Sequence, residues 1–375
     1  MSESGKQEYD VETPHRRACL KWGAGAAAWM AAAPLKANAT GGGRIPLGLD
    51  AHAVRSMRWK APQLLDYAAE IKAGALLLNG PHYLESQEET YLKQLRQRAD
   101  TKGLRIYCGA GSVSINSIGY KLKNGTPEAV LERGIRTASL LGSPVVTCRI
   151  GSIKDRYTDG GIEARMEESI QVLKALTPRA RDAGIKFAFE NHAGDLRTEE
   201  VLTVIHEVGP EVCGSMLDPG NSLWAMEDPM EQIRTLGKHV LCTSVRDYTL
   251  WEAEDGATFQ WTAIGDGLMD VQEFTQILAT QCPGVPLFVE SISNSPRPLP
   301  FLTAEHMAGY PDLKAEGLVD FLKLLRKGQP IPLVKPPAGM DKKQFDQQHQ
   351  KAELLKSFDY LRHHCNVGLK NHNHG

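Results

Sequence analysis

The chain has 375 residues, of which 42% are hydrophobic, and its formal net charge at pH 7 is −2. This length is enough for one large domain or two smaller ones. A nearly neutral chain lacks the basic excess that neutralises phosphates, so the composition excludes nucleic acid as the main partner.

The first 39 residues have the three regions of an export signal. Arg16 and Arg17 precede a short apolar stretch at 22–33, and Ala-Asn-Ala at 37–39 has the pattern of a cleavage site. The apolar stretch is too short to span a membrane. Paired arginines and weak hydrophobicity resemble a twin-arginine (Tat) signal. We therefore expect residues 1–39 to be removed and the protein to be periplasmic or secreted, with no membrane partner after cleavage. The alternative is an ordinary amphipathic helix.

From residue 44 onward, short apolar runs alternate with longer amphipathic segments. Continuous apolar runs bounded by turn residues are typical of buried parallel strands. Eight such strand–helix units predict an α/β fold, a (β/α)8 TIM barrel. A doubly wound open sheet is the alternative, but no G-x-G-x-x-G motif follows an early strand. The eight predicted strands are 45–50, 75–79, 104–109, 144–149, 185–190, 214–218, 240–247 and 285–290.

The predicted helices have recognisable starts and apolar faces. Thr126-Pro127-Glu128 begins one helix, 162–183 forms a second, and 318–326 is expected to be the last barrel helix. Residues 328–375 are predicted to form a Pro-rich linker and a C-terminal helix from Lys342 to about His364, which packs on the barrel or on a second subunit of a homo-oligomer. The apolar seam of this C-terminal helix is Leu354, Leu355, Phe358 and Leu361.

Three carboxylates close predicted strands. Glu190 ends the fifth, Asp218 follows the sixth and Glu290 ends the eighth. Because active sites of parallel α/β folds lie at the carboxyl ends of the strands, we expect these side chains to converge. Such a cluster suits a divalent metal or acid/base chemistry.

Other polar side chains follow predicted strands on the same face. His52 follows the first strand, His82 the second, and Arg149 ends the fourth. Groups in these positions line pockets and bind substrate hydroxyls, although capping of the loops is the alternative. Trp261 lies in the predicted loop after the seventh strand, where it could stack on a sugar ring or anchor the loop. Gly265-Asp266-Gly267 in that loop gives only a weak phosphate or calcium signal.

Three motifs carry a resemblance to a known family. Glu190-Asn191-His192, Leu217-Asp218-Pro219-Gly220-Asn221 and Val289-Glu290 resemble the xylose isomerase-like TIM barrel superfamily of sugar isomerases and epimerases, which includes inosose dehydratases and related lyases. The resemblance covers roughly residues 44–327. It implies that two Glu, one Asp and one His bind a divalent metal and that the two Glu transfer the proton. By position, the Glu pair is Glu190 and Glu290, and the Asp is Asp218.

The seventh strand departs from the pattern of that family. Where the family commonly has His-x-Lys-Asp, this chain has Ser244-Val245-Arg246-Asp247. A neutral hydroxyl is a poor metal ligand, so a site of Glu190, Asp218 and Glu290 favours Mn²⁺ or Mg²⁺ with water. The alternative is a site without metal, in which Arg246 or Arg149 offsets the carboxylate charges.

The expected activity is that of an isomerase or epimerase acting on a small-molecule carbohydrate or cyclitol. Glu190 or Glu290 removes a proton beside a carbonyl and an enediolate forms. A dehydratase or lyase of keto-sugars or keto-glycosides shares this intermediate, and a non-catalytic carbohydrate-binding barrel is the alternative of another class. The expected substrate-binding residues are His52, His82, Arg149, His192, Arg246 and Trp261.

Overall fold

The computed structural model describes residues 44–369. The predicted signal peptide, residues 1–39, lies outside the described residues and stays a prediction.

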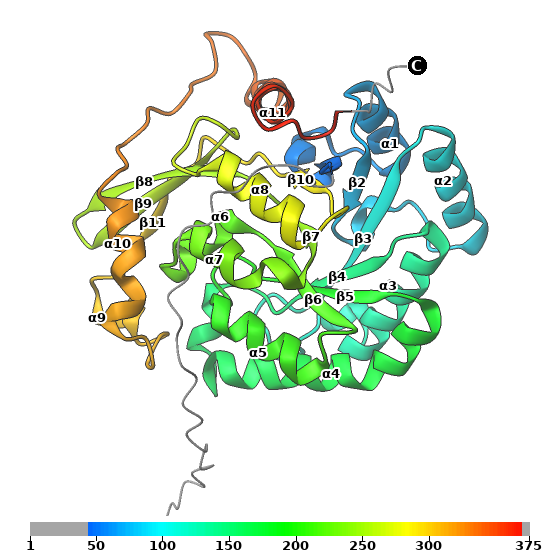
Figure 1. The fold of residues 1–375 in the computed structure, drawn as a ribbon, viewed down its shortest axis with the longest axis horizontal. Coiled ribbons are helices and arrows are strands. Elements are labelled where there is room, and N and C mark those ends of the chain that lie inside the picture. The colour runs from blue at the N-terminus through cyan, green and yellow to red at the C-terminus, as the bar shows by residue number, and fades with distance from the viewer. Residues whose placement is uncertain (1–43, 370–375) are drawn as a thin grey trace, which may run out of the picture. The chain divides into compact units, whose positions relative to one another are not determined.

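Eight parallel strands form a nearly closed barrel with helices between them, which confirms the predicted fold class (Figure 1). The sheet order is β10-β1-β2-β3-β4-β5-β6-β7, and a bridge between Val245 and Val289 joins the ends of this sheet. The strands are β1 Leu47–Asp50, β2 Ala75–Leu78, β3 Arg105–Ser112, β4 Val145–Arg149, β5 Lys186–Glu190, β6 Cys213–Leu217, β7 Val240–Thr243 and β10 Leu287–Val289.

The barrel strands are buried on both faces because helices cover their outer side. Strands that are buried on both faces have continuous apolar sequences, and for this reason the sequence predicted them. Inside the barrel a separate apolar cluster fills the centre, so the interior is a packed core. That cluster consists of Ala75, Leu77, Tyr107, Val145, Ala188, Met216, Cys242 and Phe288.

The predicted helix starts and lengths agree with the structure. The Thr126 hydroxyl accepts a hydrogen bond from the Ala129 backbone N–H at 3.3 Å and caps α3. Among residues 44–369, no helix combines the length and apolar character that crossing a membrane requires. The helices are α1 Ala61–Glu70, α2 Glu89–Thr101, α3 Pro127–Leu141, α4 Gly161–Ala183, α5 Thr198–Val208, α6 Pro219–Ser222, α7 Pro229–Leu236, α8 Val271–Gln281, α9 Ala304–Met307, α10 Val319–Leu325 and α11 Lys342–Cys365.

The seventh predicted strand is two elements in the structure. β7 ends at Thr243, and Asp247 begins β8 (Asp247–Ala253), which forms an antiparallel hairpin with β9 (Gly256–Thr262). β11 (Arg297–Leu299) adds to β9, so the predicted loop is a three-stranded sheet. The sequence does not show where β7 ends, because the residues between the two strands are also buried. Val245, for example, pairs with β10 before the hairpin begins.

The Gly-Asp-Gly turn after β9 binds a carboxylate of the protein itself. The backbone N–H groups of Gly265 and Gly267 both donate to Oδ2 of buried Asp247, at 3.0 and 3.1 Å. This internal carboxylate occupies the donors that a phosphate would need. The turn is therefore fixed to the first residue of β8, at the open end of the hairpin.

The C-terminal helix covers the last barrel strand. α11 packs against β10, α8 and the short 3-10 helix η1 (Ala51–Met57), whereas α10 packs against β8 of the small sheet (Figure 1). The expectation that 318–326 is the last barrel helix therefore differs from the structure. In the predicted seam of α11, Leu354, Phe358 and Leu361 are buried but Leu355 is exposed.

Candidate active site

Side chains from the carboxyl ends of the strands surround one cavity of about 310 Å³. Eight of the nine predicted site residues line it, and the ninth, Asp218, is fully buried next to it. Their individual roles stay predictions. The cavity is lined by His52, Arg55, Asn79, His82, Tyr83, Arg149, Glu190, His192, Ala193, Asn221, Arg246, Trp261, Glu290, Ile292 and Arg297.

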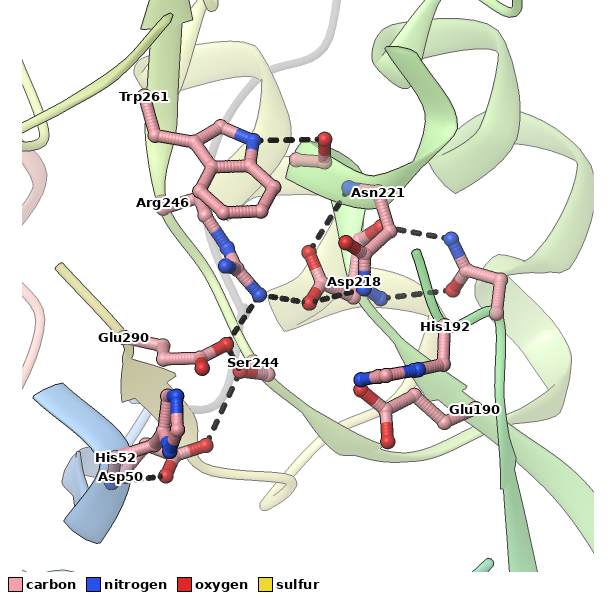
Figure 2. A network of polar contacts seen from close by, with 12 residues as sticks. Asp50, His52, Glu190, His192, Asp218, Asn221, Ser244, Arg246, Trp261 and Glu290 are labelled. Atoms are coloured by element: carbon pink, nitrogen blue, oxygen red, sulfur yellow. Dashed lines mark hydrogen bonds and ion pairs between the residues drawn. The ribbon is translucent and has the colours of Figure 1, made fainter. Parts of the chain in front are cut away.

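The three strand-end carboxylates converge as expected, and a guanidinium lies between two of them. Nη2 of Arg246 donates to Oδ2 of Asp218 and to Oε2 of Glu290 (Figure 2). The Arg246 side chain is only 3% exposed, so this is a buried ion triad. Buried charges are tolerated when they are paired and hydrogen-bonded, and removal of one member leaves the others uncompensated.

Two neighbours hold the Arg246 side chain in this position. Its guanidinium carbon lies 4.0 Å from the centre of the Trp261 ring, a cation–π contact. The indole is itself held by a hydrogen bond from Nε1 to the Gly220 carbonyl at 2.9 Å. A Cβ atom on Gly220 would lie 2.5 Å from Cγ of Arg246, so only glycine allows this approach.

Trp261 has a second arginine partner, which the sequence did not predict. Arg297 also stacks on the indole, with its guanidinium carbon 3.8 Å from the ring centre. The stacking of a sugar ring on Trp261 stays a prediction, but the structure gives the ring two guanidinium groups as partners.

Ser244 connects Glu290 to the buried carboxyl of Asp50. Its hydroxyl oxygen lies 2.7 Å from Oε2 of Glu290 and 3.1 Å from Oδ2 of Asp50. One hydroxyl hydrogen can serve only one carboxylate, so the other carboxyl must carry a proton. Burial, followed by the charge of Glu290, raises the pKa of Asp50 well above its ordinary value. Asp50 is thus the protonated partner, and Ser244 donates to Glu290.

The two glutamates have opposite electrostatic surroundings. Burial raises the pKa of Glu190 to about 7, although the Arg149 charge works in the other direction. Burial also acts to raise the pKa of Glu290, but the Arg246 charge leads the interactions that outweigh it and hold that pKa below its ordinary value. Pairs of carboxyls with separated pKa values are typical of acid/base sites.

One carboxylate oxygen of Glu190 makes no hydrogen bond to the described part of the protein. Its Oε2 is buried and has no hydrogen-bond partner among residues 44–369. The nearest cation is Nη1 of Arg149, at 3.7 Å, which is too far for a hydrogen bond. An orphaned carboxylate oxygen beside a cavity is expected to bind a ligand or a water molecule.

His192 is held as a neutral hydrogen-bonding group. Its Nδ1 contacts the Gly151 carbonyl, which can only accept, so Nδ1 carries the hydrogen and Nε2 is an acceptor. Burial, followed by the Arg149 charge, lowers the pKa of His192 to about 3. Asp195 fixes the loop by accepting hydrogen bonds from the backbone N–H of His192 at 2.7 Å and of Gly151 at 3.0 Å.

The predicted metal site is not assembled by these side chains. No group of three or more His, Cys, Asp or Glu residues within 44–369 is arranged to hold a metal ion. Two of the three predicted ligands, Asp218 and Glu290, already share the Arg246 guanidinium, and Ser244 supplies a hydroxyl instead of an imidazole. This donor set does not fit a divalent metal, because a cation already lies between its oxygen atoms.

The sequence did not single out several residues around the cavity. Asn221 donates from Nδ2 to Oδ2 of Asp218 at 2.8 Å, and its place in the Asp-Pro-Gly-Asn motif could have indicated it. Tyr83 and Arg55 lie in short 3-10 helices after strands, and Arg297 begins β11. No pattern in the sequence distinguishes these three from surface residues.

Comparisons with known proteins place this geometry in a family. The family model for the xylose isomerase-like TIM barrel matches residues 65–360. A curated relative, 3-oxo-isoapionate decarboxylase of Pectobacterium atrosepticum, is 23% identical over 217 residues, which cover 57% of this chain and 71% of the relative.

Solved structures share the fold at low sequence identity. A D-psicose 3-epimerase, in the presence of D-fructose, has a TM-score of 0.55 at 15% identity, covering 85% of this chain and 98% of its own. The IOLI protein with a binding zinc atom has a TM-score of 0.51 at 16% identity, covering 76% of this chain and 100% of its own. These similarities show the fold, and the extent of the family match shows the membership. The chain belongs to the xylose isomerase-like TIM barrel family.

Proposed function

We propose that this protein is an enzyme that removes a proton from the carbon beside a carbonyl group of a carbohydrate or cyclitol. The observation that carries the proposal is Glu190, a buried carboxyl beside the cavity, with an unbonded oxygen and a pKa of about 7. A base with a pKa near the working pH is the most effective proton-transfer group. The relative named above as a decarboxylase supports enzymatic activity.

Arg246 and Arg149 supply the positive charge for the intermediate. Loss of the proton places negative charge on the substrate oxygen, and fixed cations in a site with little water stabilise that charge. In the described part of the chain, carboxylates contact Arg246 only at Nη2, so the guanidinium retains other N–H donors. Arg149 lies 3.7 Å from Glu190, close to the proton that moves.

The remaining polar groups orient the substrate. Nε2 of His192 can accept a hydrogen bond from a sugar hydroxyl because Nδ1 is held by Gly151. Glu290, kept ionised by Arg246 and Ser244, accepts hydrogen bonds but is a weak base. Return of the proton from Glu190 to the neighbouring carbon, with transfer of the hydroxyl proton to the former carbonyl oxygen, gives isomerisation. Epimerisation instead needs a second group that delivers a proton to the opposite face of the same carbon.

Elimination or decarboxylation is the second candidate. Two-base epimerisation needs two groups that exchange protons, whereas Glu290 is committed to Arg246 and Ser244. A single residue, Glu190, suffices for elimination, because it removes the proton beside the carbonyl and then gives it to the β-substituent, which leaves with the bonding electrons as water or an alcohol. Loss of carbon dioxide from a 3-oxo acid, the reaction that the decarboxylase's name describes, passes through the same type of enolate. This observation favours lyase chemistry as the alternative to isomerisation.

Hydrogen exchange tests the proposal without knowledge of the product. Purified protein is incubated with a panel of keto-sugars in deuterated water, and deuterium incorporation is measured by NMR. Wild type and Glu252→Gln, which alters an exposed residue of β8, should exchange, whereas Glu190→Gln should not. Equal exchange by Glu190→Gln would refute the role of Glu190. Sugar binding without exchange in wild type would favour a non-catalytic carbohydrate-binding barrel.

A further inference from the structure

Two arginines from distant parts of the chain meet at the cavity that holds Glu190 and Glu290. Arg55 lies in η1, directly after β1, and Arg297 begins β11 of the small sheet. Arg55 is exposed and also borders a neighbouring cavity of about 570 Å³ under α11, whereas Arg297 is partly buried. Both contribute to the lining of the cavity, so their charges act on any ligand there.

Neither arginine has an acidic partner. Among residues 44–369, no Asp or Glu oxygen lies within 4.0 Å of the guanidinium of Arg55 or Arg297. Within that part of the chain, the guanidinium of Arg297 donates only to the backbone carbonyl of Ser295. The other two arginines of the cavity differ, because Arg149 pairs with Glu190 and Arg246 pairs with Asp218 and Glu290.

The unpaired charges are held close to another positive charge. Arg297 and Arg246 stack on the same indole, with guanidinium carbons 3.8 and 4.0 Å from the centre of Trp261. Burial, followed by the charges of Arg246 and Arg55, lowers the pKa of Arg297 to about 10. Arg246 shares Asp218 and Glu290, whereas Arg297 has no counterion within 4.0 Å among the described residues. An anionic ligand beside Arg297 would therefore lower the free energy of the site.

The surroundings of the cavity are also positive. Its lining contains four arginines against two glutamates. It shares Asn79, His82, Arg149 and His192 with a wider space of about 710 Å³, whose lining includes Lys121 and Lys123 but no Asp or Glu. A neutral sugar has no negative charge that would offset this excess of positive charge.

We propose that Arg55 and Arg297 bind a carboxylate group of the substrate, so that the site takes the anion of a sugar acid in preference to a neutral sugar. The planar fork of a guanidinium matches the two oxygens of a carboxylate. Both arginines border the cavity that holds Glu190, so one small molecule can engage the arginines and the catalytic carboxyl together. This assignment rests on the proposed function, because it describes the substrate of the same site.

Equilibrium binding tests the assignment independently of turnover. D-Glucuronate, its neutral counterpart D-glucose, and D-glucose 6-phosphate serve as probes for the full chain in isothermal titration calorimetry. Wild type should bind D-glucuronate roughly ten times more tightly than D-glucose. Arg297→Gln and Arg55→Gln should each lose most of this preference. Arg179→Gln, which removes the same charge from the exposed face of α4, should keep it.

Three binding results would overturn the assignment. Equal affinity of wild type for D-glucuronate and D-glucose, or an undiminished preference in both Arg297→Gln and Arg55→Gln, would contradict it. Tighter binding of D-glucose 6-phosphate than of D-glucuronate would show that the site prefers a phosphate. Glu190→Gln separates the two proposals, since it should abolish deuterium exchange while keeping the preference for D-glucuronate. Exchange that survives in Glu190→Gln refutes the catalytic role alone.

Discussion

The hydroxyl oxygen of Ser244, the residue directly after β7, lies 2.7 Å from Oε2 of Glu290. This contact orients Glu290 toward Arg246 and connects it to Asp50. Ser244→Ala should leave a buried carboxylate oxygen with one partner fewer. We expect a loss of about 1–3 kcal/mol in the free energy of unfolding, measured by urea denaturation. Ser139→Ala, at an exposed position of α3 whose hydroxyl makes no hydrogen bond within residues 44–369, is the control. An unchanged stability of Ser244→Ala would contradict the role of this contact.

Replacement of Arg246 tests whether its guanidinium takes the place of a metal ion. Arg246→Met should leave Asp218 and Glu290 buried without a cation, with a loss of roughly 3–5 kcal/mol in the free energy of unfolding. Millimolar Mn²⁺ should restore part of that stability in Arg246→Met and have no effect on wild type. The readout is the urea midpoint with and without Mn²⁺. Stabilisation of wild type by Mn²⁺ to the same extent would show that the triad binds metal despite Arg246.

The rate should depend on pH through Glu190. A base must be ionised to accept a proton, and burial raises the pKa of Glu190 to about 7. We therefore expect the exchange rate per enzyme to rise with pH and to level off above an apparent pKa near 7. The measurement is deuterium incorporation between pH 5 and 9. A rate that is already constant at pH 5 would assign the base to Glu290, whose pKa lies below its ordinary value.

Stability should follow the opposite trend at this residue. A carboxyl whose pKa is raised on folding binds its proton more tightly in the native state, so its ionisation favours unfolding. Glu190 makes its full contribution to the free energy of unfolding below the pKa that it has in the unfolded chain. This contribution is lost as the pH rises to about 7, the pKa of Glu190 in the folded protein. The loss amounts to roughly 3 kcal/mol. Urea titrations of wild type and Glu190→Gln at pH 4.5 and 8 should show this decrease in wild type only, after the trend common to both proteins is subtracted.

Gly220 should not tolerate a side chain. A Cβ atom there would lie 2.5 Å from Cγ of Arg246 and 2.9 Å from Nε1 of Trp261. Gly220→Ala should displace Arg246, reduce deuterium exchange and lower the free energy of unfolding by about 1–3 kcal/mol. Gly119→Ala is the matched control because its Cβ would contact only Ser117 Oγ, at 3.9 Å. Equal behaviour of the two variants would mean that the Arg246 position is not critical.

Export is predicted to depend on the paired arginines. The twin-arginine pathway reads that pair directly, so replacement of both Arg16 and Arg17 by lysine should retain the precursor in the cytoplasm. Cell fractionation and immunoblotting of the native host would measure this. Export of the double variant at the wild-type level would exclude the twin-arginine route.

The sequence predicted strands best where both faces of a strand are buried. All eight barrel strands appeared as apolar runs, and Glu190, Asp218 and Glu290 were placed at their ends. The 240–247 run was misread because two successive elements, β7 and β8, are both buried and only their partners differ. Periodicity reports burial but does not report which strand is the neighbour.

The sequence by itself determined the barrel and the face on which the site lies, because apolar runs set the strands and parallel strands end at a common edge. The tertiary structure decided how the charges are paired. Arg246 reaches Asp218 and Glu290 only because the chain leaves β7 toward β10 and then turns into the hairpin that carries Trp261. Arg55 and Arg297 become neighbours of one cavity only through folding. Contacts between distant side chains depend on register and packing, which local patterns do not encode.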